Sequence, residues 1–600
     1  GSTMFMNSRI FNCIKRAACS FLTVAFFLQQ SLLVPVFAES NISGVTSGGS
    51  GTFNIEPTGV SGSTGFRHYY YFNLGRGDIA NLLFRLESQG IDITRFVNFV
   101  DNTVNINGIL NTMRGNNFYN GHAIFISPGG MIIGASGVLN VGSLTAIAPS
   151  PSTYNSMKAL AGGTGVLDAN GNIAKKFSDA ELMNILPAKG SKIDVNGKII
   201  ARDDVNLHAN YVNVGSDAST KLSTGIVAGL KNHAEALSSQ EQAEALFNGL
   251  VSHNGASGSS MVLEGGKVVI KATSKETSSA ADPLNPDTVE AGISVKNASI
   301  AGGDVAIAAS ATQEISANVN TLTTALLDVF EENQSVDEFF ENYFSTNPYE
   351  NFDGARTKAN VEITNADITA HGGGSANGDV LIGADASSVM NVNSEIIGSV
   401  FPNLLYAIGT KTEALVNLNE GTTVNAAGNV AVRAFTNNSS EVSISNGSLI
   451  SFDALSAIQL AILNSSTISK TKAKVNKGAV INANDVSVSA VNSSVSEIEI
   501  SSTASVGDNE LKKETTEGGV TTVQNGSGVS FNALIKNIST DTEAVVEGEI
   551  NSRGTTAVTA QSLSVTRGAS ESSTDDGDYM DENGNKIENP TEEQKAQGKK

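Results

Sequence analysis

The chain has 600 residues, more than one ordinary globular core holds, and its formal net charge is −22 at pH 7. This acidity argues against nucleic-acid binding and against electrostatic docking on anionic lipid, since both need a positive surface. Only 16% of the residues are charged, 6% are aromatic, and Gly occurs 59 times. That composition favours a long sheet-rich rod over a compact enzyme.

Residues 1–38 are predicted to be a secretory signal peptide. Basic residues precede an apolar stretch, and Val36-Phe37-Ala38 places small residues at the −3 and −1 positions, so cleavage is expected between Ala38 and Glu39. A retained membrane anchor is the alternative, which Gln29-Gln30 and Pro35 disfavour by interrupting the apolar run. No later segment has eighteen uninterrupted apolar residues, so we expect no transmembrane segment in the mature chain.

The only two cysteines, Cys13 and Cys19, lie inside the predicted signal. The mature chain would therefore have no disulfide, and burial and hydrogen bonding would have to stabilise it. The six histidines show no metal-ligand spacing, so we expect no metal site. We also find no phosphate loop, nucleophile elbow or paired acid and base, which predicts no cofactor, no catalytic residues and no enzyme activity.

Arg76-Gly77-Asp78 is an integrin-type tripeptide and is a candidate binding site. The residues after it offer another interpretation. Ile79, Leu82, Leu83 and Leu86 share one helical face, so Asp78 could instead be the N-cap of a helix that ends near Gly90.

The segment 121–150 contains four short apolar bursts separated by small residues, which predicts very short strands with glycine corners. From residue 190 on, two alternating apolar residues followed by alanine recur, usually after Asp or Asn, and a second strand precedes each by about ten residues. The motif ends at Ala209, Ala272, Ala309, Ala384, Ala434, Ala490 and Ala560. The irregular spacing is compatible with coils of about 20–25 residues plus insertions.

A single coil of this kind is not expected to be stable. About five inward apolar side chains contribute about 1.5–3 kcal/mol each. Ordering about twenty residues costs about 1–2 kcal/mol each in backbone entropy. Stacking adds hydrogen bonds and shared burial between coils, so the pattern predicts an all-β solenoid.

Three segments are predicted to be helical excursions from the solenoid. Residues 177–187 carry a capping box between Ser178 and Glu181, and Pro187 ends the helix. Residues 233–250 are helix-like, and residues 322–344 fit two short helices, which could instead bind a partner. The polar, non-periodic residues 566–600 are predicted to be a linker or tail, with the chain continuing beyond them.

The stretch that begins at residue 121 resembles the haemagglutination-type, or two-partner-secretion, domain of filamentous bacterial exoproteins. Ser127-Pro128-Gly129-Gly130-Met131 takes the place of that family's Asn-Pro-Asn-Gly-Ile-type motif, and Val141-Gly142-Ser143-Leu144-Thr145-Ala146 that of its "VG.L.A" motif. With "STGFRHYYYFNLGRGDIANLLF", the pattern looks closest to leukotoxin-type filamentous adhesins. The chain departs from the family at Ser127 and Gly129, where the family has asparagines.

The resemblance implies a right-handed parallel β-helix, with a two-partner-secretion domain over residues 39–300 and a repeat region over 301–565. It also implies export through an outer-membrane partner transporter, a secreted or outer-membrane-surface location, and attachment to a host-cell receptor or glycan. Two alternatives stay open: the N-terminal delivery stalk of a contact-dependent toxin, and a β-helical polysaccharide hydrolase or lyase.

Overall fold

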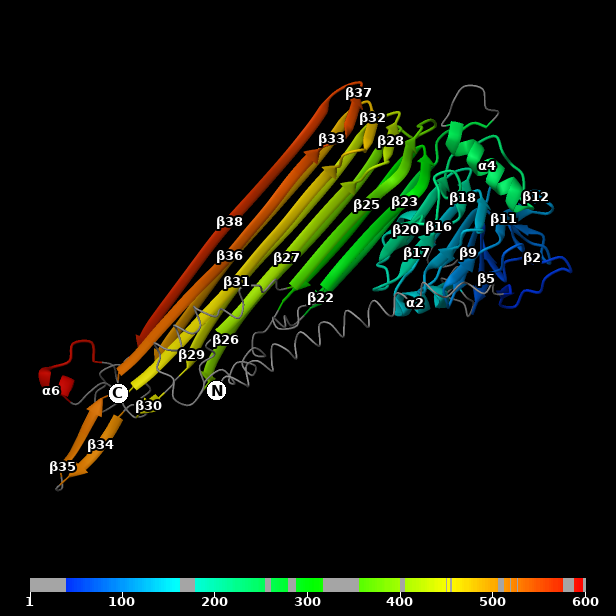
Figure 1. Cartoon of the computed structure of the whole chain (residues 1–600). Coiled ribbons are helices and arrows are strands. Elements are labelled where there is room, and N and C mark those ends of the chain that lie inside the picture. The colour runs from blue at the N-terminus through cyan, green and yellow to red at the C-terminus, as the bar shows by residue number, and fades with distance from the viewer. Residues whose placement is uncertain are drawn as a thin grey trace, which may run out of the picture.

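The computed structural model describes residues 39–161, 178–253, 261–278, 288–316, 355–399, 405–448, 451–453, 456–505, 512–517, 520–525, 527–575 and 587–596. Within these residues the chain is an all-β parallel solenoid, as the sequence predicts. The colours in Figure 1 follow one another in order across the stack, so each rung lies beside the rung that precedes it in sequence. The predicted signal peptide, residues 1–38, and the predicted helices at 322–344 lie outside the described residues.

Three ladders of strands form the sides of the solenoid, and the first ladder consists of strands that begin most rungs. Its members are β1 (Asn41–Ile42), β5 (Phe72–Leu74), β10 (Val104–Ile106), β14 (Met131–Ile133), β17 (Lys192–Val195), β20 (Tyr211–Val214), the first half of β23 (Thr288–Gly302), the first part of β25 (Ala355–Ala370), β27 (Leu405–Leu418), β31 (Ser456–Val475) and β36 (Ser527–Val546). Neighbours in this ladder pair in parallel except β1 and β5.

The second ladder belongs to the same sheet and follows the first in each rung. Its members are β2 (Thr52–Ile55), β6 (Ile79–Leu83), β11 (Ile109–Arg114), β15 (Val138–Val141), β18 (Lys198–Ala201), β21 (Gly225–Val227), the second parts of β23 and β25, β28 (Thr423–Ala426), β32 (Val480–Ala483) and β37 (Glu549–Ser552). The helix predicted over residues 79–90 is therefore wrong, because this segment forms β6 and the short hairpin of β7 (Arg85–Leu86) and β8 (Ile91–Asp92).

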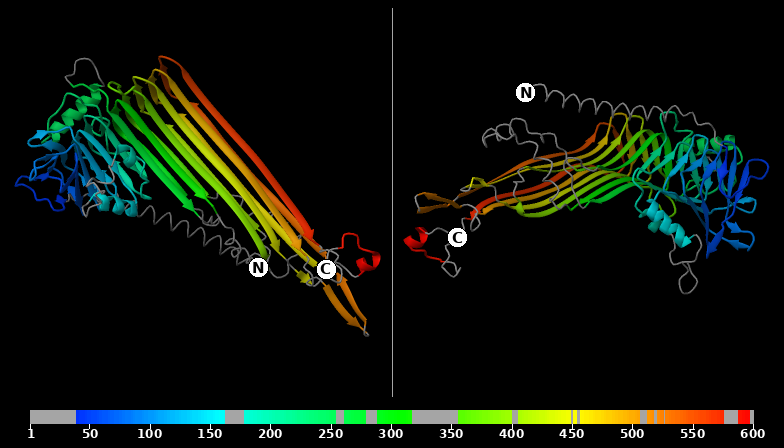
Figure 2. Two further views of the ribbon diagram at one scale, coloured as in Figure 1. Left: turned by 180° about the vertical axis from the view of Figure 1, so that it is seen from behind. Right: turned by 90° about the horizontal axis from the view of Figure 1, so that it is seen from below.

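The third ladder forms the opposite sheet. Its members are β4 (Thr64–Tyr69), β9 (Arg95–Val100), β13 (His122–Ile126), β16 (Ser143–Ile147), β19 (Val205–Ala209), β22 (Lys267–Ser278), β24 (Asp304–Ile315), β26 (Val380–Ser399), β29 (Val430–Ser448), β33 (Val486–Ser505) and β38 (Thr556–Asp575). In the first and third ladders the strands are short up to β20 and long from β22 onward, and these long strands run side by side as a twisted layer (Figure 2).

The predicted repeat alanines occupy one position of the third ladder. They pair from rung to rung in unbroken register: Ala209, Ala272, Ala309, Ala384, Ala434, Ala490 and Ala560. The first six are buried and Ala560, in the last rung, is exposed. Each interval between alanines is therefore one rung, longer than the 20–25 residues expected. The first interval contains the helix α4 (Gln240–His253), and in the later rungs the strands continue well beyond the alanine.

The interior of the long rungs changes character along the strands. Near the second ladder it is apolar, with residues such as Val305, Ile307 and Val432 fully or almost fully buried. Further along, the inward positions are polar, and beyond them Val442, Ile498 and Ile500 are apolar again. We call the polar band the seam; it consists of Gln313, Thr357, Ser388, Thr410, Thr412, Thr436, Asn438, Ser440, Ser465, Thr467, Ser469, Thr471, Asn492, Ser494 and Ser496.

Several elements lie outside the three ladders. The helices are α2 (Pro151–Ala161), α3 (Asp179–Met183), α4 (Gln240–His253) and α6 (Glu592–Ala596), and the small antiparallel strands are β3 (Gly59–Ser61), β12 (Asn117–Phe118), β30 (Ser451–Asp453), β34 (Lys512–Glu517) and β35 (Val520–Asn525). The capping box predicted at Ser178 is present in α3. The helix predicted over 233–250 begins later, at Gln240, and α2 was not predicted although Pro151 occupies a typical first position.

Two changes in the strands lie near the predicted domain boundaries at residues 300 and 565. The change from short to long strands comes at Lys267, before residue 300, and the apolar core is continuous across both positions. The last strand runs to Asp575, ten residues into the segment predicted to be a tail from residue 566.

Candidate functional site

The predicted secretion motif forms the corner between β13 and β14. The N–H of Gly130 donates to the carbonyl of Ser127 at 3.0 Å, and the Ser127 hydroxyl donates to the carbonyl of Asn102 at 2.7 Å in the preceding rung. Gly130 has a φ of +76°, and a Cβ added there would lie 1.9 Å from the Lys192 carbonyl oxygen. Pro128 and Gly129 are at the corner, as expected for residues that a central ladder excludes.

The remaining motif residues lie inside the same coil. Met131, Val141, Leu144 and Ala146 are almost fully buried in the common apolar core. Gly142 leaves no space for a side chain, since an added Cβ would lie 2.4 Å from the carbonyl carbon of Asn120. The structure thus brings the two predicted motifs together, but it places them in corners and core, and most of their side chains are hidden in the folded chain.

The Arg76-Gly77-Asp78 tripeptide forms the turn between β5 and β6. Arg76 and Gly77 are exposed, and the N–H of Asp78 donates to the Gly75 carbonyl at 3.2 Å. The Asp78 carboxylate accepts a hydrogen bond from the Ser40 hydroxyl and lies against Gly51. The expectation that Asp78 caps a helix is wrong, and its carboxylate is engaged within the molecule.

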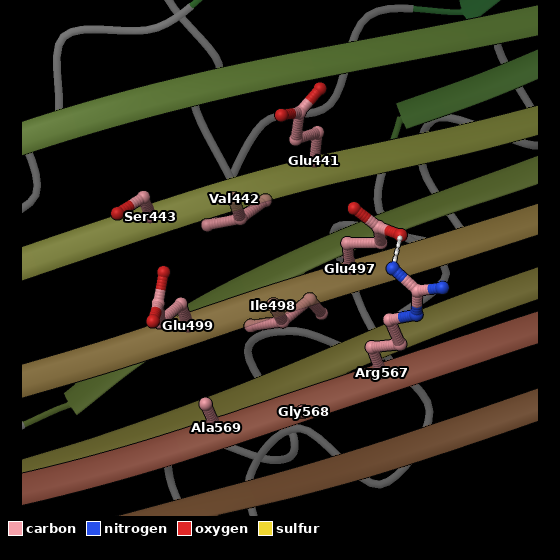
Figure 3. Close-up of a pocket in the computed structure, with 9 residues that line it drawn as sticks. All are labelled: Glu441, Val442, Ser443, Glu497, Ile498, Glu499, Arg567, Gly568 and Ala569. Atoms are coloured by element: carbon pink, nitrogen blue, oxygen red, sulfur yellow. Dashed lines mark ion pairs between the residues drawn. The ribbon is translucent and has the colours of Figure 1, made fainter.

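A groove crosses three long strands on the outer face of the third ladder (Figure 3). Its volume is about 280 Å³, and it is lined by Glu441, Val442, Ser443, Glu497, Ile498, Glu499, Arg567, Gly568 and Ala569 of β29, β33 and β38. The buried side chains of Val442 and Ile498 point to the opposite face, so their main chain forms the floor. The small side chains of Ser443 and Ala569 keep one wall low.

The charge of the groove is predominantly negative. Arg567 Nη1 pairs with Glu497 Oε1 at 3.2 Å, and Glu441 and Glu499 add two carboxylates on neighbouring strands. All of these groups are largely solvent-accessible, so their interactions are screened. The arrangement can attract cationic or hydroxyl-bearing groups. Among the residues that the structure describes, no cluster of side chains has the composition of a metal site.

The groove was not predicted, although the sequence contains a signal for it. Glu441, Glu497 and Arg567 each follow a repeat alanine by seven residues, and the register pairs all three. Alignment of the repeats on their alanines would have placed these charges side by side. The signal was weak because the six residues between the alanine and the charge are mostly polar in every repeat and show no regular apolar period.

No protein-family model and no curated protein matches the chain. Over the described part of the chain, none of the helices has the length and apolar character needed to cross a membrane.

Proposed function

We propose that the chain is a secreted filamentous adhesin of the leukotoxin-like type, exported through an outer-membrane partner transporter and attaching to host or other cells. The observation that supports this proposal most strongly is the unbroken register of the repeat alanines from Ala209 to Ala560. Such a register gives an elongated stack with broad outer faces, which suits display at a distance from a cell surface.

The broad faces favour many weak contacts over one tight contact. The groove on β29, β33 and β38 is shallow, and the outer faces elsewhere repeat the same strand spacing. Affinity would then come from several rods engaging one surface, because linked weak sites gain avidity. A net charge of −22 keeps neighbouring rods apart through repulsion.

The burial of the motif residues bears on how export would work. Val141 and Leu144 are fully buried, so a transporter would have to read them before the coil folds. Each new rung would then bury its inner face on the preceding one outside the cell, and this burial would oppose backward movement of the chain.

Export is tested by producing the chain in a diderm bacterium with and without a two-partner-type transporter. We expect the native chain to reach the medium only with the transporter. Val141→Asp combined with Leu144→Asp should leave the chain in the periplasm, because two carboxylates cannot be buried in the core. Ile132→Asp is the matched control, since Ile132 lies on β14 in the same coil but is 38% exposed. Normal export of the double variant, or export without the transporter, would contradict the proposal.

Attachment is tested separately with the purified mature chain. Beads coated densely with residues 39–600 should adhere to cultured mammalian cells, and sparsely coated beads should adhere much less. Equal adhesion at both densities would argue against multivalent display, and no adhesion to any cell or glycan tested would argue against the adhesin function.

The groove also supports a second candidate, cleavage of a polysaccharide. Glu497 and Glu499 point to the same face of one strand, about 7 Å apart along it, a separation compatible with a pair of glycosidase carboxylates. Incubation with a panel of polysaccharides would detect released reducing ends or unsaturated products. Cleavage that Glu497→Gln or Glu499→Gln abolishes would favour this candidate over the adhesin.

A further inference from the structure

An extended segment crosses the outer face of the second ladder just before α4, and we call residues 231–239 the strap. Asn111 pairs with the main chain of Leu237 in both directions, accepting from its N–H at 2.9 Å and donating to its carbonyl at 3.0 Å. Asn140 donates to the carbonyl of Glu235 at 2.9 Å. The strap and α4 together cover the apolar face of this ladder, on the side where Figure 1 shows α4 next to β18 and β12.

Arg202 holds the beginning of the strap and is the most deeply buried arginine among the described residues, with 4% of its surface exposed. Its Nε donates to the His233 carbonyl at 2.6 Å, its Nη1 donates to Asn140 Oδ1 at 2.5 Å, and its guanidinium lies 3.9 Å from the centroid of the Phe118 ring. Its Nη2 is buried and has no hydrogen-bond partner.

The positive charge of Arg202 lacks a paired carboxylate in the described structure. The nearest acid in sequence, Asp203, is occupied by Lys231 at 3.0 Å and by the Asn120 amide at 3.0 Å. Burial alone lowers the pKa of Arg202 to about 9. An unpaired buried charge is costly, and so is a buried donor without an acceptor.

A second unsatisfied group belongs to His233, the residue whose carbonyl accepts from Arg202 Nε. His233 Nε2 is buried and has no partner. Burial lowers the pKa of His233, the charge of Arg202 lowers it further, and Glu235 opposes them. Arg202 Nη2 needs a hydrogen-bond acceptor, and His233 Nε2 can donate to one in the tautomer that carries the ring proton there.

We propose that a small inorganic anion, of the size of chloride or bromide, binds between Arg202 Nη2 and His233 Nε2 and fixes the strap to the solenoid. An anion supplies both missing acceptors and offsets the buried charge at once. A water molecule could accept hydrogen bonds but would leave the guanidinium uncompensated. The charged groups around the site are Lys231, Asp203 and Glu235, and the first two are paired with each other.

The site is tested directly with bromide. Crystals of the full chain grown in chloride and soaked in bromide should show an anomalous peak within about 3.5 Å of both nitrogens, since charge-assisted hydrogen bonds to halides have that reach. Absence of the peak, with a water molecule or nothing in its place, would overturn the proposal. This measurement on the native chain decides the question even if every variant fails to fold.

Hydrogen exchange supplies a solution test. The amide of Leu237, which donates to Asn111, should exchange about tenfold more slowly in 200 mM chloride than in 200 mM gluconate at the same ionic strength, as expected for a site with a Kd of about 20 mM. Arg202→Met should abolish this difference. Arg433→Met is the matched control, because it removes an exposed arginine on β29, several rungs away from the strap, and should leave the chloride effect unchanged. A chloride effect that survives Arg202→Met, or that Arg433→Met removes equally, would overturn the proposal.

Discussion

The carboxylate of Asp379 accepts a hydrogen bond of 2.8 Å from the N–H of Asn429, the residue at the equivalent corner of the next rung. The same contact recurs along the solenoid: Asp304 accepts from Asp379 at 3.0 Å, Asn429 from Asp485 at 3.1 Å, and Asp485 from Thr555 at 2.7 Å. The Asp or Asn at each of these four corners thus does more than favour a turn. It connects one rung to the next.

Replacement of Asp379 by alanine should destabilise the long rungs. The variant leaves the N–H of Asn429 without its charged acceptor, which costs about 1–2 kcal/mol, as for loss of a helix N-cap. Asp379→Asn should retain most of the native stability, since the side chain of Asn429 accepts the equivalent hydrogen bond in the next rung. Urea unfolding followed by circular dichroism gives the free energies.

Asp385→Ala is the control for this series. Asp385 lies in the strand that follows Asp379, and its carboxylate pairs with Arg433 at 3.2 Å on the surface, an interaction worth about 1 kcal/mol at most. If Asp385→Ala destabilised the chain as much as Asp379→Ala, the corner hydrogen bond would have no special role.

Gly130 and Gly190 offer a matched test of the motif corner. Both have φ near +77°, but a Cβ at Gly190 meets nothing within 4 Å, whereas a Cβ at Gly130 meets the Lys192 carbonyl oxygen at 1.9 Å. Gly190→Ala should cost about 1–2 kcal/mol from backbone strain alone. Gly130→Ala should cost clearly more, about 3 kcal/mol or above, because the backbone of the next rung must also move. Similar unfolding midpoints for the two variants would show that the backbone near Lys192 moves away from the added Cβ at little cost in free energy.

The repeat alanines show how much of the fold could be predicted from the sequence. Strict alternation before Ala309 or Ala434 identifies an inward face, and the structure stacks these alanines in register. The length of the strands could not be predicted, because the inward positions after Ala434 are Thr436, Asn438 and Ser440. Polar residues on the buried face remove the hydrophobic period, although the strand continues.

The incorrect helix near the N-terminus and the groove that was not predicted have different causes. Ile79, Leu82 and Leu83 fit a helical spacing as well as a strand, and only pairing with β2 and β11 decides between them. The groove depends on Glu441, Glu497 and Arg567, which are more than fifty residues apart in sequence and become neighbours only through the register of the rungs.

Two buried histidines should make the N-terminal rungs sensitive to acid. Burial lowers the pKa of His122 to about 4 and that of His208 to about 3, and each imidazole bonds a threonine hydroxyl, Thr145 at 2.8 Å and Thr273 at 2.7 Å. In the unfolded chain both have a pKa near 6.5. The unfolded state therefore binds more protons below pH 6.5, so full stability is present above that pH and is lost as the pH falls toward 4.

Between about pH 6.5 and pH 4, the free energy of unfolding should fall by about 1.4 kcal/mol per pH unit for each imidazole. The slope of the unfolding free energy against pH should decrease by the contribution of about one proton in His208→Gln. It should decrease further in the double variant His122→Gln with His208→Gln. Burial raises the pKa of Asp101, but hydrogen bonds from Tyr154, His68 and Lys158 outweigh burial and lower the pKa overall. Asp101 therefore contributes to the pH dependence of stability only below about pH 4. Urea titrations at pH 7, 6, 5 and 4.5 give the slope, and an unchanged slope in the double variant would contradict the assignment.

The seam contains two kinds of buried threonine, and they should respond oppositely to replacement by valine. Thr412 Oγ1 has no hydrogen-bond partner, whereas Thr436 Oγ1 contacts Thr471 Oγ1 at 2.5 Å and donates to Asn492 Oδ1 at 2.8 Å. Thr412→Val keeps the shape and removes an unsatisfied hydroxyl, so it should be neutral or stabilising by about 1 kcal/mol. Thr436→Val leaves the buried Thr471 hydroxyl without a partner and removes one of the two donors to Asn492 Oδ1, so it should destabilise by about 1–3 kcal/mol. The free energies of unfolding of the two variants, measured against the native chain in the same buffer, decide the point. Stabilisation by both would mean that the polar contacts of the seam contribute nothing to stability, and destabilisation by both would mean that Thr412 has an acceptor in solution, such as an ordered water.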